Sequence, residues 1–129
     1  MKTLRLVIVT TILMLVIACG NAAPPISNSE LSQRVAGNDA PLILDVRTDK
    51  EYASGHVPGA INIPVDQLPG RLAELRRHDN AEIVVYCESG RRAGKAADIL
   101  IGDGFLNIRH LQGDMRQWRQ DGLPMDSGT

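Results

Sequence analysis

Cysteine, basic residues and long apolar runs are all scarce in this sequence. Its 129 residues include 2 cysteines, so a framework of several disulfides is excluded. Fourteen Lys and Arg against 15 Asp and Glu leave no basic excess, and nothing here predicts nucleic-acid binding. None of the 3 histidines stands at a metal-ligand spacing from a cysteine or another histidine. The sequence therefore predicts neither a metal nor a cofactor.

The longest apolar run lies at the N-terminus. Lys2 and Arg5 precede an apolar stretch from Leu6 to Ala18 that is broken only by threonines. A basic start followed by an apolar core of this length is typical of a secretory signal. A transmembrane span needs about 20 apolar residues, so an anchor helix is the weaker alternative. We expect residues 1–18 to be a signal peptide and the protein to be exported.

The stretch VIAC, residues 16–19, resembles the lipobox of bacterial lipoproteins. The resemblance implies lipidation of Cys19, cleavage before it, and a protein anchored on the periplasmic side of a cell-envelope membrane. Two or three acyl chains hold a soluble domain firmly, whereas one is marginal. Ordinary cleavage near Ala22 or Ala23 is the alternative. Gly20, in place of Asp, favours the outer membrane over the inner one where that sorting rule applies.

The rest of the chain is the size of one domain. Loss of Lys2 and Arg5 with the signal leaves twelve basic and fifteen acidic residues, a net charge of about −3. Residues 19–28 are small, polar and proline-rich, which is typical of a tether. We expect a folded domain over residues 29–126 and a short tail over 127–129. For so small a domain we expect a monomer.

Short apolar runs alternate with helical patterns along the domain. Strands are expected near 41–45, 60–63, 82–87 and 107–111, and helices near 27–36, 68–78, 93–101 and 113–121. A single helical turn is expected at 50–53. This alternation predicts an α/β domain with a parallel sheet covered on both faces.

Cys87 ends one of these strands and is followed by the loop ESGR and a helix starting near Arg92. Ligands of such folds bind beyond the carboxyl ends of the strands. A helix N-terminus with nearby cations favours the thiolate form of a cysteine, and Gly90 lets the loop N–H groups turn inward as an anion-binding nest. With Cys19 lipidated, Cys87 has no disulfide partner in the chain. The pattern predicts a nucleophilic thiol, and a buried structural cysteine is the alternative.

Three sequence blocks resemble the rhodanese (thiosulfate sulfurtransferase) family. CESGRR matches the family's active loop C-x-x-G-x-R, LILDVRTDKEYASGHVPGAINIP its N-terminal signature, and LQGDMRQWRQDGLPM its C-terminal one. The resemblance implies a rhodanese-like α/β fold with about five parallel strands. It further implies that Cys87 takes a sulfane sulfur from thiosulfate or a persulfide and passes it to cyanide, a thiol or an acceptor protein.

The same resemblance assigns roles around the loop. Its N–H groups would hold the outer sulfur of the persulfide, and the side chains of Arg91 and Arg92 are suited to a donor's oxygens. The whole active loop is therefore a predicted substrate-binding segment: Glu88, Ser89, Gly90, Arg91 and Arg92. Asp45 and Arg47 are expected to support the loop by ion pairs. His56 is expected to be a hydrogen-bonded turn residue, and Trp118 to pack the last helix.

Loop length separates this family from cysteine phosphatases and arsenate reductases. Those enzymes place five residues between Cys and Arg, whereas Glu88–Arg91 makes four, which suits a single sulfur atom better than a tetrahedral oxyanion. Three residues depart from the family pattern. Glu88 puts a carboxylate in the loop and is expected to oppose anionic donors. Ala93 replaces a frequent Ser, and Asp114 replaces the second Gly of the C-terminal signature.

Two alternative functions are compatible with the same domain. An idle rhodanese-like module would bind or sense at the membrane, although idle relatives typically lose the cysteine that this chain keeps. A sulfur carrier would use the chemistry of Cys87 and deliver to a partner protein.

Overall fold

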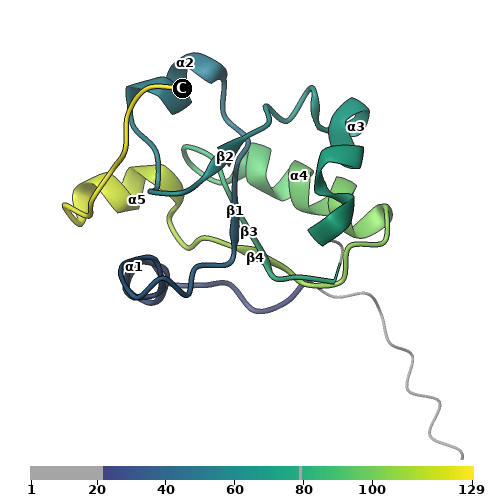
Figure 1. Cartoon of the computed structure of the whole chain (residues 1–129). Coiled ribbons are helices and arrows are strands. Elements are labelled where there is room, and N and C mark those ends of the chain that lie inside the picture. Colours follow the sequence, from purple (N-terminus) through teal and green to yellow (C-terminus); the bar gives the residue numbers. More distant parts are fainter. Residues whose placement is uncertain (1–21, 79) are drawn as a thin grey trace, which may run out of the picture.

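The computed structural model describes residues 22–78 and 80–129 (Figure 1). The predicted signal peptide and Cys19 lie outside the described residues. Four parallel strands form the sheet in the order β2-β1-β3-β4. They span Leu42–Asp45 (β1), Ile61–Asn62 (β2), Ile83–Tyr86 (β3) and Ile108–His110 (β4). The predicted α/β class and parallel sheet are confirmed.

The two central strands are paired in register along their whole length. Leu42 aligns with Ile83, and Asp45 with Tyr86. All four residues of β3 are buried, as expected for a strand that is covered on both faces. Cys87 follows β3 directly. Cys87 therefore lies at the carboxyl edge of the sheet, beside the residues that follow β1.

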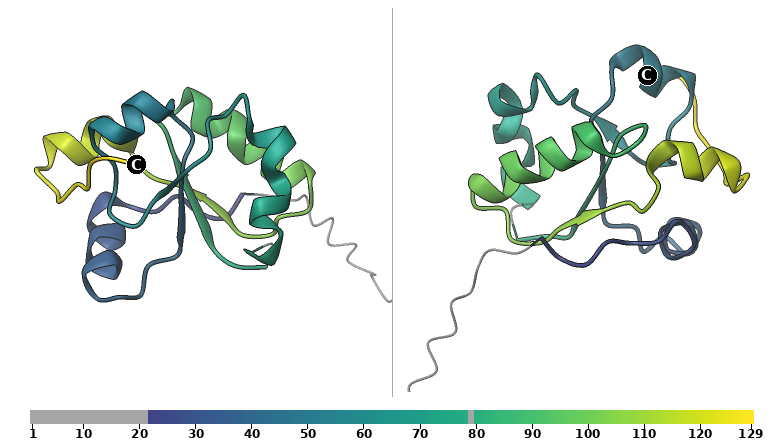
Figure 2. Two further views of the ribbon diagram at one scale, coloured as in Figure 1. Left: turned by 45° about the horizontal axis from the view of Figure 1, so that its top comes forward. Right: turned by 180° about the vertical axis from the view of Figure 1, so that it is seen from behind.

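Helices cover both faces of the sheet (Figures 1 and 2). Helix α4 (Arg91–Gly102), helix α3 (Leu68–Arg71) and the 3₁₀ helix η1 (Leu72–His78) lie on one face. Helices α1 (Asn28–Ala36) and α5 (Asp114–Gln120) lie on the other. The short helix α2 (Asp49–Ser54) follows β1 at the carboxyl edge. Each face has its own buried apolar cluster, and Cys87 belongs to the one under α4.

Local sequence signals explain where the helices start. Ser27 caps α1 by accepting the N–H of Glu30, and Gly37 follows the helix as predicted. Thr48 and Glu51 form a reciprocal capping box at the start of α2. The expected helix near 68–78 divides into α3 and η1, with Leu68 and Leu75 fully buried.

The number of strands differs from the expected five. Over the described ranges the sheet has four strands, and next to β4 there is one more bridge, between Ile26 and Leu111. Pro24 and Pro25 precede Ile26 and have no N–H to donate, which limits this segment to a single bridge. Part of the stretch expected to be a tether thus contacts the sheet, since Ile26 is fully buried.

In the part of the chain that the structure covers, every helix is too short or too polar to cross a bilayer.

Candidate active site

Cys87 lies at the carboxyl end of β3, where the chain turns into α4. Its side chain is buried, and Sγ accepts a hydrogen bond from the N–H of Gly90 at 3.0 Å. Gly90 precedes α4 with a φ of 111°, in the region that disfavours side chains. A Cβ at this position would also lie 3.1 Å from Oδ2 of Asp114. Glycine is therefore required here both by conformation and by space.

The start of α4 gives the loop its electrostatic character. The first N–H groups of a helix have no acceptor within the helix and carry a partial positive charge. The 12 residues of α4 begin at Arg91, four residues after the sulfur. The loop thus combines a thiol, a left-handed glycine and a helix N-terminus, which is the end of a helix that attracts anions.

The backbone of the loop is held from the side by the first turn of α5. The carbonyl of Cys87 accepts the N–H of Met115 at 3.0 Å, and the carbonyl of Glu88 accepts that of Arg116 at 3.1 Å. The N–H of Cys87 donates to Oδ1 of Asp114 at 2.9 Å. Three bonds therefore tie the nucleophile's peptide units to one neighbouring helix.

A buried ion pair supports the loop from β1. The Asp45 carboxylate accepts Nε and Nη2 of Arg47 at 3.1 and 2.8 Å, and both side chains are almost fully buried. The hydroxyl of Tyr86 donates to the same carboxylate at 2.7 Å, and burial raises the pKa of Tyr86. Nη1 of Arg47 lies 3.5 Å from Oε2 of Glu88. Asp45 and Arg47 thus connect the end of β1 to the active loop.

The loop carboxylate has two cationic partners. Glu88 pairs with Arg47 and with Arg119 of α5. The sequence predicts that this carboxylate repels anionic donors, and the structure adds two guanidinium groups that offset its charge. Opposite charges within hydrogen-bond distance cancel much of the field that a donor would meet.

Arg92 points to a protein carboxylate. Its Nη1 and Nη2 donate to the two oxygens of Glu51 at 2.7 and 3.0 Å. This bidentate bond lowers the pKa of Glu51 to about 2. Arg92, which the family pattern assigns to the donor, therefore also fastens α2 to the first turn of α4. The side chains of Ser89 and Arg91 are exposed.

His56 lies in the turn after α2, and its hydrogen bonds are to Tyr52 and Asp126. Nδ1 is 2.8 Å from the carbonyl of Tyr52, and the two rings are stacked with centroids 3.6 Å apart. Its backbone also exchanges two hydrogen bonds with Asp126. These contacts are those of a turn residue. Trp118 is buried, and its Nε1 donates to the carbonyl of Pro124 at 2.8 Å.

The sequence reasoning missed one pair at the site. Nε2 of His110, at the end of β4, lies 2.9 Å from Oδ1 of Asp114, the oxygen that also accepts the N–H of Cys87. Asp114 is 3% exposed and has a φ of 55°. The sequence shows Asp114 as a departure from the glycine of the C-terminal signature, four residues after His110, but it does not show that the two side chains meet or that Asp114 contacts the loop.

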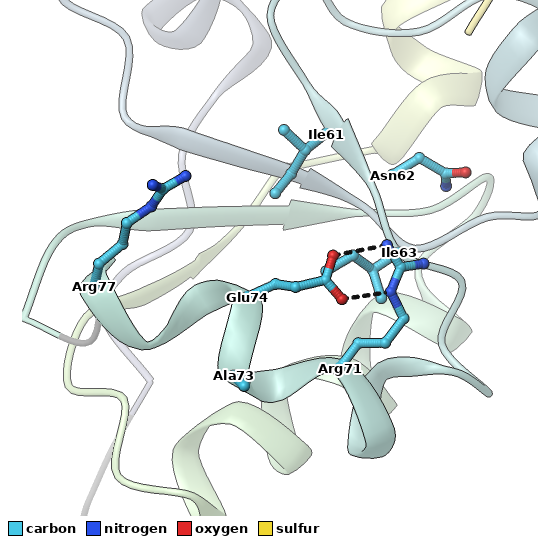
Figure 3. A pocket seen from close by; sticks show the side chains of 7 residues that line it. All are labelled: Ile61, Asn62, Ile63, Arg71, Ala73, Glu74 and Arg77. Carbon is cyan, nitrogen blue, oxygen red and sulfur yellow. Dashed lines mark hydrogen bonds and ion pairs between the residues drawn. The ribbon is translucent and has the colours of Figure 1, made fainter.

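Two cavities border the loop. One of about 310 Å³ is lined by Glu88 with Arg47, Glu51, Ser54, Gly55, Arg119 and Met125. The other, of about 290 Å³, lies on the β4 side and is lined by Pro25, Ser89, Gly90, His110, Leu111, Gln112, Gly113 and Asp114. A larger cavity of about 520 Å³ lies at the β2 edge, with the ion pair of Arg71 and Glu74 in its wall (Figure 3). No residue of the Cys87 loop lines this cavity, so it is not the site around Cys87 although its volume is larger.

The fold and the loop define a class of protein: a parallel α/β domain with a buried cysteine between a strand and a helix. The chain belongs to the rhodanese-like domain family, whose model matches residues 27–121. The resemblance in the sequence blocks is thereby confirmed.

Three relatives illustrate the membership. A sulfurtransferase of Allochromatium vinosum is 34% identical over 100 residues, which are 78% of this chain and 92% of that protein. A putative sulfur carrier protein of Bacillus subtilis, YrkF, is 36% identical over 98 residues, 76% of this chain and 52% of that protein. The structure of the human single-domain sulfurtransferase TSTD1 has a TM-score of 0.66 at 31% identity, covering 77% and 97% of the two chains. This chain thus spans most of two relatives and about half of the third.

Proposed function

We propose that the protein is a sulfurtransferase that carries a sulfane sulfur on Cys87. The observation that carries the proposal is the position of Sγ, which lies beneath the N–H of Gly90 at the start of α4. This position stabilises a thiolate before the reaction and a persulfide anion after it. Relatives named sulfurtransferase support a role in sulfur transfer.

The reaction has two displacement steps. The Cys87 thiolate attacks the outer sulfur of the donor, and the donor's S–S bond breaks. Its electron pair leaves on sulfite when the donor is thiosulfate, or on a thiolate when it is a persulfide. An acceptor then attacks the outer sulfur of the Cys87 persulfide and regenerates the thiolate. Cyanide becomes thiocyanate, and a thiol becomes a persulfide. Splitting one transfer into two covalent steps gives ping-pong kinetics.

Cavity and charge favour a persulfide over thiosulfate as the donor. The cavity beside Glu88 is lined by two carboxylates, Glu51 and Glu88, as well as by guanidinium groups. Both carboxylates are already paired with arginines, so fewer cationic groups are free to receive a dianion. A donor with a lower negative charge loses less solvation free energy when it enters such a site.

A sulfur carrier is the second candidate function, favoured by the relative named a putative sulfur carrier protein. It uses the same Cys87 persulfide and differs only in its acceptor, which would be a protein. A catalytically idle module remains the contrasting hypothesis, since it predicts no sulfur on Cys87.

Intact mass tests these functions directly. A soluble chain beginning at Asn21 keeps every described helix and strand. It is reduced, incubated with thiosulfate or glutathione persulfide, and compared with Cys87→Ser. A gain of one sulfur atom in the wild type only, reversed by cyanide, is the expected result. No gain from either donor in a folded protein with a free thiol would overturn the proposal in favour of the idle module.

We also propose that the protein is exported and lipidated on Cys19. The support is the sequence of residues 1–19, with its basic start, apolar core and lipobox-like VIAC. Two or three acyl chains would hold the domain at the envelope membrane.

A further inference from the structure

We propose that His110 and Asp114 are positioning residues for sulfur transfer, and this inference rests on the proposed function. Asp114 fixes the backbone of Cys87, and His110 fixes the carboxylate of Asp114. The evidence is the single oxygen Oδ1, which lies 2.9 Å from both the N–H of Cys87 and Nε2 of His110.

The carboxylate of Asp114 is buried against the loop and is not an exposed side chain that lies nearby by chance. Asp114 is 3% exposed, and burying a carboxylate is costly unless hydrogen bonds compensate it. Two donors converge on Oδ1. Its other oxygen, Oδ2, lies 3.1 Å from where a Cβ of Gly90 would stand. The side chain of Asp114 therefore extends beneath the loop between its nucleophile and its glycine.

The backbone conformation of Asp114 is a second observation at this position. Asp114 has a φ of 55°, in the left-handed region that favours glycine over residues with a side chain. Asn38, beyond α1, is the other non-glycine residue with positive φ in the described ranges. A glycine at 114 would relieve this strain but would leave the N–H of Cys87 without its acceptor.

His110 determines how that acceptor is oriented. It ends β4, four residues before Asp114, and its ring lines the cavity of about 290 Å³ together with Ser89 and Gly90. A carboxylate only accepts hydrogen bonds, so Nε2 must carry the proton in this contact. The ring thereby restricts the rotamer of Asp114 through the same oxygen that accepts the N–H of Cys87.

Sulfur transfer requires the attacking and leaving atoms to be aligned, and a displacement of about 1 Å can cost a hundredfold in rate. A positioning role therefore predicts a loss in kcat without a matching change in KM. It also predicts faster alkylation of Cys87, because a loosened loop exposes a thiol that is otherwise buried. A general loss of structure would produce the same two changes, so the thermal midpoint of each variant must also stay close to that of the wild type.

The test uses the full chain solubilised in detergent, with persulfide as donor and cyanide as acceptor. Asp114→Gly and His110→Phe remove the contacts. Asp114→Asn and His110→Gln restore an oxygen acceptor and an N–H donor, respectively. Asn38→Gly is the matched control, because it places glycine at a left-handed position remote from the loop.

We expect Asp114→Gly to lower kcat about ten- to a hundredfold, with KM changed less than about twofold. Cys87 alkylation by iodoacetamide should become several-fold faster. His110→Phe should show the same pattern to a smaller degree, and both restoring variants should approach the wild type. Wild-type kcat and alkylation in Asp114→Gly, or an Asp114→Asn as slow as Asp114→Gly, would overturn the inference. If the wild type transfers no sulfur, the proposed function fails, and the alkylation rates still decide the positioning.

Discussion

At the residue scale, the proposed function rests on Cys87, and the proposed choice of donor rests on Glu88. Cys87 lies in a buried position and receives an N–H from Gly90. Glu88 adds a carboxylate that is paired with Arg47 and Arg119. The chemistry of the sulfur and the charge that surrounds it can therefore be changed one side chain at a time.

Replacing Cys87 with Ser should abolish sulfur transfer and leave the fold intact. Serine is a close isostere, and its hydroxyl can accept the N–H of Gly90, so the thermal midpoint should change by only a few degrees. Thiocyanate production measures the activity, and circular dichroism the folding. Residual turnover above about one thousandth of the wild type would mean that another group carries the sulfur.

Glu88→Gln should improve the use of thiosulfate. Removal of the carboxylate leaves the guanidinium groups of Arg47 and Arg119 available to a dianion, so KM for thiosulfate should fall about three- to tenfold. The effect should shrink at high salt, because screening weakens exposed charges. Glu74→Gln is the control, since Glu74 pairs with Arg71 far from the loop. An unchanged or higher KM in Glu88→Gln would show that its charge does not govern donor choice.

At the element scale, the site is a junction where several elements are tied to one loop. Glu51 of α2 holds Arg92 of α4, and Asp45 and Arg47 connect the end of β1 to Glu88. Ion pairs between elements that are distant in sequence restrict their relative movement, whereas an i,i+3 pair such as Arg71 with Glu74 stabilises only its own stretch of chain.

Glu51→Gln should lower the free energy of unfolding by about 1 kcal/mol at pH 7, after allowance for the solvent screening of a partly exposed pair. The pKa of Glu51 is lowered to about 2, chiefly by its hydrogen bond to Arg92. The stabilisation is therefore complete above the unfolded-state pKa, about 4.3, and is lost as the pH falls towards 2. Chemical denaturation of both proteins at several pH values measures the difference.

The control for this experiment is again Glu74→Gln, which removes a pair between residues only three positions apart in the chain. The difference between wild type and Glu51→Gln should narrow progressively below about pH 4.5. A difference that stays constant down to pH 2.5 would show that charge on Glu51 is not its source.

The sequence predicted the elements well because each has a local signal. Ser27 caps α1, and the β-branched run of β3 ends at Cys87. The active loop could be predicted from the sequence because its residues are contiguous in the chain. Two contacts could not be predicted from the sequence. Arg92 and Glu51 are distant in the chain and are brought together by the crossovers of the fold. His110 and Asp114 are close in the chain, but their spacing does not determine the direction in which α5 starts.

At the scale of the whole molecule, the proposed lipid on Cys19 would attach the domain to a membrane. If Cys19 is lipidated, Cys19→Ser should release the protein from the membrane fraction into the soluble exported fraction. The reason is that one or more acyl chains, each contributing about 0.8 kcal/mol per buried CH₂, would be lost. Fractionation with detection of the protein measures this. A Cys19→Ser protein that stays in the membrane would favour retention of the N-terminal apolar segment as an anchor helix.

The first contact between the incoming chain and the sheet has a consequence for orientation. The N–H of Ala23 bonds to the carbonyl of Ile108, the first residue of β4, whereas Cys87 follows the last residue of β3. In the described residues, the chain thus joins the domain at the edge of the sheet opposite to Cys87. Cys19 lies four positions before Ala23, and four residue steps span at most about 14 Å. A lipid on Cys19 would then hold the domain close to the bilayer with its sulfur turned towards the aqueous compartment, where a dissolved donor or another protein can reach it.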